Sequence, residues 1–586
     1  MSQRFLPAWP APGSNRELLL LLFFSLLFLG LGIGLRSPWP ADEPRFAQIA
    51  LEMIHSGDWL FPHRGGELYP DKPPVFVWMQ AVFYLLTGSM AVAFLLPSLL
   101  SSLVVLGLVY DLCRRFHGTE FARYGALLLL CTLQFVMQAK KGQIDMTVCM
   151  WITLGNYGLL RHFLQGPDWR WYYTAWFAMG LGVITKGVGF LPALMCLPYL
   201  WLCLRHARQE MSLRGSLLHL LGIAVMLAAI ALWVLPMVLA VGQGGDAAHI
   251  AYRDNIMMRQ TTERYVSGVG GHYKPFYYYF VAVIAALWFP LSVLLPGLVR
   301  RWIEAARKGD RLVILVFTWS LLVLLFFSLS PGKRGVYVLP ILPMLAVIAA
   351  PYLPDILAMR RVRSWAWIGT FTVGALLIIG ALALAVAGPE VIDKLHLEAE
   401  LPWLFVFLLG LVLLVPAWAW RHSQPVTGMF VGLCLVWVLY STWGYRLMEP
   451  LRSPRGMMQE VNQIIGPESE LAIADFREQL LLFSGREVTH FGFHADKALQ
   501  QRAAARWLSE APSRRWVLLP LGSAQDCFDE RTSIDIDHRH RRSWYLVRFE
   551  NLLPEEELQS RGCDWRNTDL AHYRSPAVDP GWYFLD

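Results

Sequence analysis

Charged residues gather in a polar segment that separates the first two long apolar runs of the chain. The segment carries the sequence DEPR at residues 42–45 and YPDKPP at residues 69–74. Charges so close to apolar runs are costly in lipid unless they face water or a polar ligand. The segment therefore predicts an active site at a membrane surface, in which Asp42 accepts a proton from an acceptor hydroxyl or phosphate. A role as a helix cap is the simpler interpretation and fits Glu43 better.

Cations in this segment and in three later loops suit an anionic ligand. Lys72 precedes a proline-started apolar segment, where an ammonium group can hold a lipid phosphate at headgroup depth or simply extend to the interface. Lys186 and Lys333 each stand beside a glycine, which lets the backbone approach an anion closely. A longer loop adds Arg264 and His272 among aromatic residues. We expect these loops to form a phosphate-binding pocket.

Asp145 begins an apolar run beside Lys140 and Lys141. An unpaired carboxylate at the middle of a bilayer costs about 2.5–3.5 kcal/mol, so this side chain needs a partner if it lies one turn inside a membrane helix. A structural salt bridge and a supporting role in the active site both stay open. Six such charges left separately in hydrocarbon would cost on the order of 15–20 kcal/mol, more than the usual net stability of a domain. We therefore expect the charged loops to share one cavity.

The composition predicts an α-helical polytopic membrane protein. Of the 586 residues, 55% are hydrophobic and 16% are charged, whereas about a quarter of an ordinary soluble domain is charged. Apolar runs of about twenty residues, each long enough to cross a bilayer as a helix, recur from Leu18 to Tyr445. We predict about thirteen spans, at residues 18–35, 91–112, 121–137, 143–164, 171–185, 188–204, 215–241, 275–300, 311–330, 334–353, 364–387, 401–420 and 427–447.

The positions of arginine and lysine predict the orientation of these spans. With thirteen spans and a cytoplasmic N-terminus, the strongest short basic loops face the cytoplasm, as the positive-inside rule requires. The short apolar segment 74–87 then lies along the outer surface or begins a tilted span, because another full crossing would reverse every later loop. The outer face receives the loops that hold the candidate residues, at 36–73, 138–142, 242–274 and 331–334, and the turn at 185–187.

A change of composition after Met448 predicts a second domain. A membrane domain at residues 1–447, with outer loops at 36–90 and 242–274, is followed by a soluble domain at 448–586. Strand-like runs at 470–476, 516–521 and 543–549 around a helix at 496–509 predict a small α/β fold, which an odd number of spans places in the periplasm. Cys527 and Cys563 share this domain and can form a disulfide if it is exported.

The charged segment resembles the first periplasmic loop of bacterial polyprenyl-phosphate-sugar glycosyltransferases. The resemblance starts at residues 42–63 and 68–74, covers about residues 18 to 350, and is greatest for the lipid A aminoarabinose transferases, within a wider group that includes the protein O-mannosyltransferases. It continues through IDM at 144–146, ITKG at 184–187, RY at 264–265, HYKPFY at 272–277, GK at 332–333 and YVLP at 337–340.

The resemblance implies a C-type (GT-C) fold with thirteen membrane helices, an outer soluble domain and an inverting transfer. An acceptor oxygen would attack the anomeric carbon of the sugar and expel polyprenyl phosphate, a stable anion that needs no general acid and that cations would stabilise. By this resemblance Asp42 is the leading catalytic carboxylate and Asp145 supports the site. The residues that would contact substrate or phosphate are Arg45, Lys72, Lys186, Arg264, His272, Lys333 and Tyr337.

Two positions depart from the family pattern. Asp71 stands before the motif lysine where aminoarabinose transferases commonly have glutamate, and residues 261–265 lack the histidine expected before Arg264. A divalent metal ion held by an acidic residue and a histidine would have to use Asp71 and His272.

We therefore expect a monomeric enzyme of the bacterial inner membrane that moves an aminoarabinose-like sugar from undecaprenyl phosphate to lipid A on the periplasmic side. The alternatives are transfer to protein, O-antigen or another envelope glycan, a transporter or flippase, and a nonenzymatic lipid-binding scaffold. A transporter would be expected to show paired halves or charges at the midplane, and the sequence indicates neither. The net charge of +7 is scattered in short clusters, which argues against a nucleic-acid partner.

Overall fold

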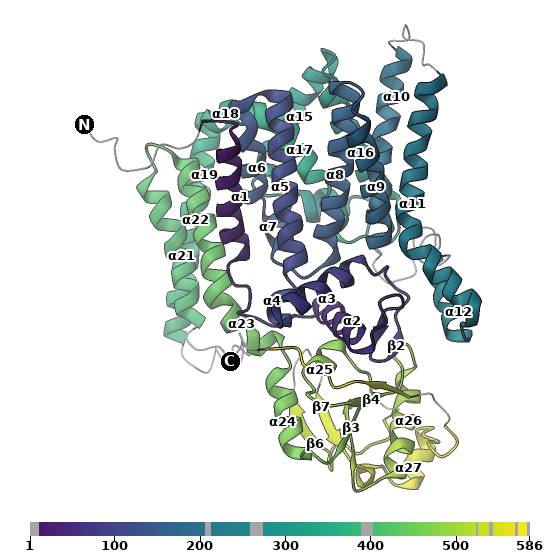
Figure 1. The fold of residues 1–586 in the computed structure, drawn as a ribbon. Coiled ribbons are helices and arrows are strands. Elements are labelled where there is room, and N and C mark those ends of the chain that lie inside the picture. Colours follow the sequence, from purple (N-terminus) through teal and green to yellow (C-terminus); the bar gives the residue numbers. More distant parts are fainter. Residues whose placement is uncertain are drawn as a thin grey trace.

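Long apolar segments fold into a bundle of helices, because a helix satisfies its own backbone hydrogen bonds and can lie in lipid. A layer of short helices lies across one end of this bundle, and a β-sheet with its own helices follows beyond that layer (Figure 1). The computed structural model describes residues 11–205, 213–257, 273–387, 402–522, 526–537, 543–568 and 572–582.

Within the described residues, eight helical segments are long and apolar enough to cross a membrane. They are Met90–His117, Val188–Arg205, Leu217–Gly244, Arg311–Leu329, Ile341–Ala358, Arg360–Val386, Pro402–Ala419 and Pro425–Arg452. Two bent pairs bring the number to ten if each counts as one span. These pairs, Thr119–Ala139 with a bend of 74° and Tyr279–Arg307 with a bend of 110°, fall on the predicted spans 121–137 and 275–300.

Three further helices pack in the bundle beside these segments. They are α1 (Asn15–Gly30), α8 (Ile144–Gln165) and α9 (Trp169–Lys186), and α1 and α8 both contact α5 (Leu96–His117). None of the three is among the segments that are long and apolar enough to cross a membrane, and α1 has only 16 residues. The predicted number of thirteen spans therefore stays a prediction.

The other helices of the bundle follow the order of the apolar runs. They are α4 (Met90–Ala93), α6 (Ala122–Cys131), α7 (Leu133–Ala139), α10 (Cys196–Arg205), α11 (Leu213–Gly244), α12 (Ala247–Asp254), α14 (Ala285–Leu287), α15 (Leu291–Arg307), α16 (Arg311–Leu329), α17 (Ile341–Ala349), α18 (Leu353–Ala358), α19 (Arg360–Ala387), α21 (Pro402–Ala419), α22 (Pro425–Leu439) and α23 (Tyr445–Arg452).

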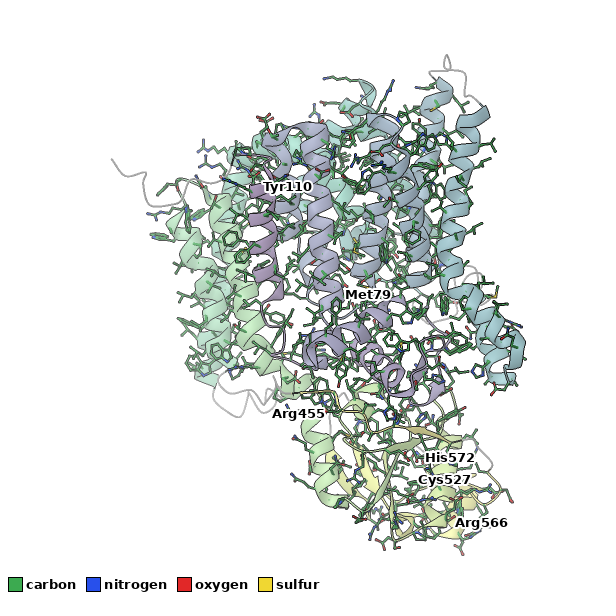
Figure 2. All side chains as sticks on the ribbon, viewed as in Figure 1. Met79, Tyr110, Arg455, Cys527, Arg566 and His572 are labelled. Atoms are coloured by element: carbon green, nitrogen blue, oxygen red, sulfur yellow. A yellow bond between two sulfur atoms is a disulfide. The ribbon has the colours of Figure 1, made fainter. Side chains whose placement is uncertain are left out.

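The first polar segment forms most of the layer between bundle and sheet. Helix α2 (Glu43–Ser56) has a proline in its first turn and ends at Gly57, whose φ of 73° is left-handed. Helix α3 (Val75–Thr87) follows Pro74 and ends at Gly88 with a φ of 67°. At 13 residues it is too short for a full crossing and lies across the bundle end, near Met79 in Figure 2.

A small hairpin fastens this layer to the C-terminal part of the chain. Strands β1 (His63–Arg64) and β2 (Glu67–Leu68) pair around Gly65 and Gly66, which have φ values of 67° and 78°. Such a turn favours glycine at both positions. A Cβ atom on Gly66 would also lie 2.5 Å from the carbonyl oxygen of Arg574.

The C-terminal part contains a six-stranded mixed sheet with the order β6-β7-β5-β3-β4-β8. Strands β3 (Glu470–Ile473), β5 (Arg515–Pro520) and β7 (Trp544–Val547) and helix α26 (Lys497–Glu510) confirm the predicted elements. The elements that the sequence did not predict are α24 (Arg455–Ile465), α25 (Glu478–Leu482), β4 (Val488–His490), β6 (Ile534–Asp537), α27 (Glu555–Ser560) and β8 (Tyr573–Ser575). Cys527 and Cys563 form a disulfide in this part.

Alternating residues of the central strands serve two hydrophobic cores. Leu471 and Ile473 belong to the core that continues through α2 and α3 into the bundle, whereas Ala472 belongs to a second core under α26. This alternation follows from the period of two in a strand. One face of the sheet is thereby packed directly against the layer that carries the polar segment.

Candidate active site

Asp42 lies at the start of α2, and residues from three separate segments of the chain surround its carboxylate. Its Oδ2 accepts a hydrogen bond from Arg334 at 2.7 Å and another from Gln143 at 3.2 Å. Arg45, one turn further along α2, places a guanidinium nitrogen 3.8 Å from Oδ1. The side chain of Asp42 keeps 15% of its surface exposed, so one edge of the carboxylate remains accessible.

The cations around Asp42 keep it ionised. Burial by itself would raise the pKa of this carboxyl, but Arg334, Arg45 and Lys186 together outweigh burial, and the pKa lies below its usual value. The same pairing raises the pKa of Arg334 although burial opposes it. Asp42 is therefore a charged acceptor at neutral pH, available to a proton or a hydrogen-bond donor of a substrate.

Asp145 and Lys186 form an ion pair next to Asp42. Asp145 lies in the first turn of α8, Lys186 is the last residue of α9, and their charged groups are in direct contact. The ammonium group of Lys186 also lies 4.8 Å from the ring centre of Tyr337, in the short helix Gly335–Val338. Because Asp145 also contributes to the raised pKa of Arg334, the two carboxylates belong to one charged network.

Arg45 links this network to the C-terminal sheet. Its Nε donates a hydrogen bond of 2.7 Å to Glu478, the first residue of α25. The same carboxylate oxygen lies 3.5 Å from Arg64, and the hydroxyl of Tyr69 also interacts with Arg45. The structure thus places Arg45 between two carboxylates. One of them, Glu478, is 433 residues away in the sequence.

Glu43 braces the backbone around the site. It forms two hydrogen bonds with Arg36, of 2.6 and 2.9 Å, and accepts one from the backbone N–H of Gly142 at 2.9 Å. It also accepts from the backbone N–H of Trp39 at 2.8 Å. The expected role of Glu43 as a helix cap is therefore wrong, because the structure shows no side-chain capping hydrogen bond at α2 and Glu43 instead joins the start of that helix to the loop before α8.

Lys72 and Lys333, two further predicted phosphate ligands, contact backbone carbonyl oxygens in this structure. Lys72 donates to the carbonyl oxygen of Asp71 at 2.7 Å. Lys333 is buried and donates to the carbonyl oxygens of Ser330, at 2.6 Å, and Lys274, at 3.1 Å. An anion could replace one of these neutral carbonyl partners, because a lysine ammonium group bonds more strongly to a charged acceptor.

Arg264 and His272 lie outside the described residues. Of the two residues expected to hold a metal ion, only Asp71 is therefore described. Within the described ranges, His, Cys, Asp and Glu form no group of three or more that could hold a metal ion. The metal ion expected at Asp71 and His272 stays a prediction.

Three residues of the network were not predicted from the sequence. Arg334 is one of them, although a pair of cations in one glycine-flanked loop was a usable signal. Gln143 and Glu478 carried no signal, because a single glutamine before a helix and a glutamate in a soluble segment are common. Their roles depend on contacts across 101 and 433 residues of sequence.

The chain is similar in sequence to proteins of known name. A family model described as dolichyl-phosphate-mannose-protein mannosyltransferase matches residues 71–235. A Pseudomonas fluorescens protein named undecaprenyl phosphate-alpha-4-amino-4-deoxy-L-arabinose arabinosyl transferase 1 is 31% identical over 436 residues, which cover 71% of this chain and 74% of that protein. A Pectobacterium atrosepticum protein with the same name, without the number, is 26% identical over 92% of this chain and 99% of its own length.

A solved structure shows the same fold. The crystal structure of ArnT from Cupriavidus metallidurans bound to undecaprenyl phosphate superposes with a TM-score of 0.68 at 20% sequence identity, and the match covers 92% of this chain and 99% of that chain. The GT-C fold expected from the resemblance is thereby confirmed. The chain belongs to the family of undecaprenyl phosphate-alpha-4-amino-4-deoxy-L-arabinose arabinosyl transferases, which are membrane glycosyltransferases that use a polyprenyl-phosphate-linked sugar.

Proposed function

We propose that this protein transfers an aminoarabinose-like sugar from undecaprenyl phosphate to lipid A at the periplasmic face of the inner membrane. The observation that carries the proposal is the Asp42 carboxylate, held ionised by Arg334, Arg45 and Lys186 at the end of the helix bundle. The names of the relatives support the donor, because they all specify undecaprenyl phosphate carrying 4-amino-4-deoxy-L-arabinose.

In the proposed reaction an acceptor oxygen attacks the anomeric carbon of the sugar while the bond to polyprenyl phosphate breaks. Asp42 orients the attacking group and accepts its proton. The departing phosphate takes the bonding electrons and becomes an anion, which the ammonium groups of Lys72 and Lys333 stabilise at the membrane surface. Arg264, which lies outside the described residues, remains a further candidate for contact with a phosphate.

The low pKa of Asp42 favours a phosphate of lipid A over a hydroxyl of a protein as the acceptor. A carboxylate whose pKa is lowered by cations is a weak base. A phosphate monoester, whose second pKa is about 6, gives up its proton far more readily than an alcohol. The same cations that make Asp42 a poor base would attract an acidic acceptor.

We also propose the thirteen spans and the periplasmic location of the sheet. Adding α1, α8 and α9 to the ten apolar segments reaches the predicted number, with Asp42 and the sheet at the same end of the bundle (Figure 1). The disulfide between Cys527 and Cys563 supports an oxidising compartment such as the periplasm. We also propose that the protein acts as a monomer.

The test is sugar transfer by the purified protein with radiolabelled undecaprenyl-phosphate aminoarabinose as donor and lipid A as acceptor. We expect turnover by the wild type and a fall in kcat of about a hundredfold for Asp42→Asn, the lower end of the roughly 10²–10⁴ that general base catalysis contributes, because Asp42 is a weak base. Asp111→Asn, a change of the same kind at the opposite end of the bundle, should keep kcat within twofold.

Each alternative gives a different result in this assay. Normal turnover by Asp42→Asn would remove Asp42 from the mechanism. Preferential labelling of a hydroxyl peptide or O-antigen would make the acceptor assignment wrong. Donor translocation into vesicles without product would indicate a flippase, and donor binding without either would indicate a scaffold.

A further inference from the structure

The C-terminal sheet supplies one buried carboxylate to the charged network around Asp42. Glu478 is 3% exposed and contacts Arg45 at 2.7 Å and Arg64 at 3.5 Å. Helix α25, which begins with Glu478, packs against α2, which carries both Asp42 and Arg45. The contact is therefore part of the packed junction between the layer and the sheet, and the junction of the two parts near Arg455 can be followed in Figure 2.

The charges around Arg45 make Glu478 necessary for its position. Arg64 is 3% exposed and lies with its guanidinium 3.5 Å from the ring centre of Phe493. Without Glu478, the guanidinium groups of Arg45 and Arg64 would share a buried volume with no carboxylate between them. Arg45 would then be drawn to the nearest remaining anion, Asp42, from which it now stands 3.8 Å away.

Arg45 is bonded to Glu478 and interacts with Asp42 at a longer distance. Its closest carboxylate contact is Glu478 rather than Asp42, since the two separations are 2.7 and 3.8 Å. Arg45 in this position influences Asp42 electrostatically without covering it by a direct hydrogen bond. The carboxylate of Asp42 thereby keeps an edge open for substrate.

We propose that Glu478 is a positioning residue for catalysis, which acts on Asp42 by anchoring Arg45. The inference rests on the proposed function, because it takes Asp42 as the catalytic carboxylate. It makes the C-terminal part of the chain a component of the active site rather than an independent module. Arg45, expected from the sequence to bind phosphate, has in this proposal the role of holding the charge balance at Asp42.

The test is a double-mutant cycle in the full-length protein with the sugar-transfer assay. Glu478→Gln and Arg45→Gln should each lower kcat about tenfold, with the KM for donor changed less than twofold, because both leave the donor-binding lysines intact. The double variant should also be lower by about tenfold, since the two residues act as one unit. Glu478→Asp, which keeps the charge, should recover part of the lost kcat.

Glu52→Gln is the matched control. Glu52 is a buried carboxylate of the same helix α2, and it too faces the C-terminal part, but it accepts hydrogen bonds from the backbone N–H groups of Gly65 and Gly66. This variant should lower the thermal midpoint while kcat stays within twofold. If Glu478→Gln does not purify in folded form, the cycle is measured with Glu478→Asp and Arg45→Gln.

Three results would overturn the inference. They are an unchanged kcat in the Glu478 variants, a hundredfold loss in the double variant, and a loss in Glu52→Gln equal to that in Glu478→Gln. These results are distinct from failure of the proposed function, in which Asp42→Asn itself keeps normal turnover.

Discussion

The two ends of the helix bundle both hold paired carboxylates, but they assemble them differently. At the end away from the sheet, near Tyr110 in Figure 2, Asp111 pairs with Arg114 and Arg115 of its own helix. In the same region Glu17 accepts a hydrogen bond of 2.7 Å from the backbone N–H of Gly13. At the sheet end, Asp42 is held mainly by groups 101 and 292 residues away.

This difference separates structural charge from candidate catalytic charge. Pairs three and four residues apart on a helix form wherever the helix forms, so the pairing of Asp111 with Arg114 and Arg115 needs only local structure, and Tyr157 adds one contact from 46 residues away. The site around Asp42 forms only if α2, α8, α9 and the segment after α16 come together. Charges held by long-range contacts lose their partners with small changes in packing. Substitutions and acid should therefore affect the two ends of the bundle differently, in three ways that can be measured.

The largest effect is expected from Arg334→Gln. Removing the 2.7 Å partner of Asp42 should lower kcat/KM at neutral pH about a hundredfold, because the carboxylate loses its orientation. The pKa of Asp42 should rise, since its strongest cationic neighbour is lost, and the acid limb of the pH profile of kcat/KM should move to higher pH. The measurement is the rate of sugar transfer between pH 4 and pH 8.

Arg334→Lys and Arg115→Gln sharpen the result. The lysine variant keeps the charge and should recover part of the activity, whereas the second variant removes an arginine from the far end and should keep kcat/KM within twofold. Equal losses in Arg334→Gln and Arg115→Gln would show that the two ends do not differ in the way described.

A smaller effect is expected when acid lowers the stability of the junction between the layer and the sheet. The imidazole of His490 donates from Nε2 to the carbonyl oxygen of Gly65 at 2.5 Å and accepts from the N–H of Gly492, so it is neutral. Burial lowers its pKa from 6.5 to about 4. The unfolded state therefore binds the proton first, and stability present above pH 6.5 is lost as the pH falls towards 4.

Between pH 6.5 and pH 5 this loss amounts to about 2 kcal/mol. The thermal midpoint should fall over this interval in the wild type and much less in His490→Gln. Hydrogen exchange should rise at residues 63–68 and not at residues 111–117. Equal sensitivity of both segments to acid would contradict a junction held by His490.

The smallest effect is expected from Asp111→Asn at the far end. The variant loses charge pairing with Arg114 and Arg115 but keeps a side chain that can accept from Tyr157, now bonded at 2.7 Å. We expect a loss of about 1 kcal/mol in unfolding free energy, typical of partly exposed pairs, with no change in kcat per folded molecule. A loss of activity without a change in stability would place this cluster in the catalytic pathway.

Much of the fold could be predicted because its signals are local. Prolines and glycines mark the ends of α2 and α3, and short apolar runs mark β3, β5 and β7. Strands β4 and β8 could not be predicted, because strands of three residues acquire their stability from their neighbours in the sheet. The bends of 74° and 110° were also missed, since both lie within continuous apolar runs.

The sequence by itself determined that the chain is built of membrane helices and which of its loops carry unusual charge, because hydropathy and charge density are properties of each segment alone. It also contained the motifs that place the chain in its family. Only the tertiary structure decided which charges meet. Arg334 lies on Asp42, Lys186 on Asp145 and Glu478 on Arg45 because the packing of distant helices and of the sheet sets those distances, and no local pattern encodes them.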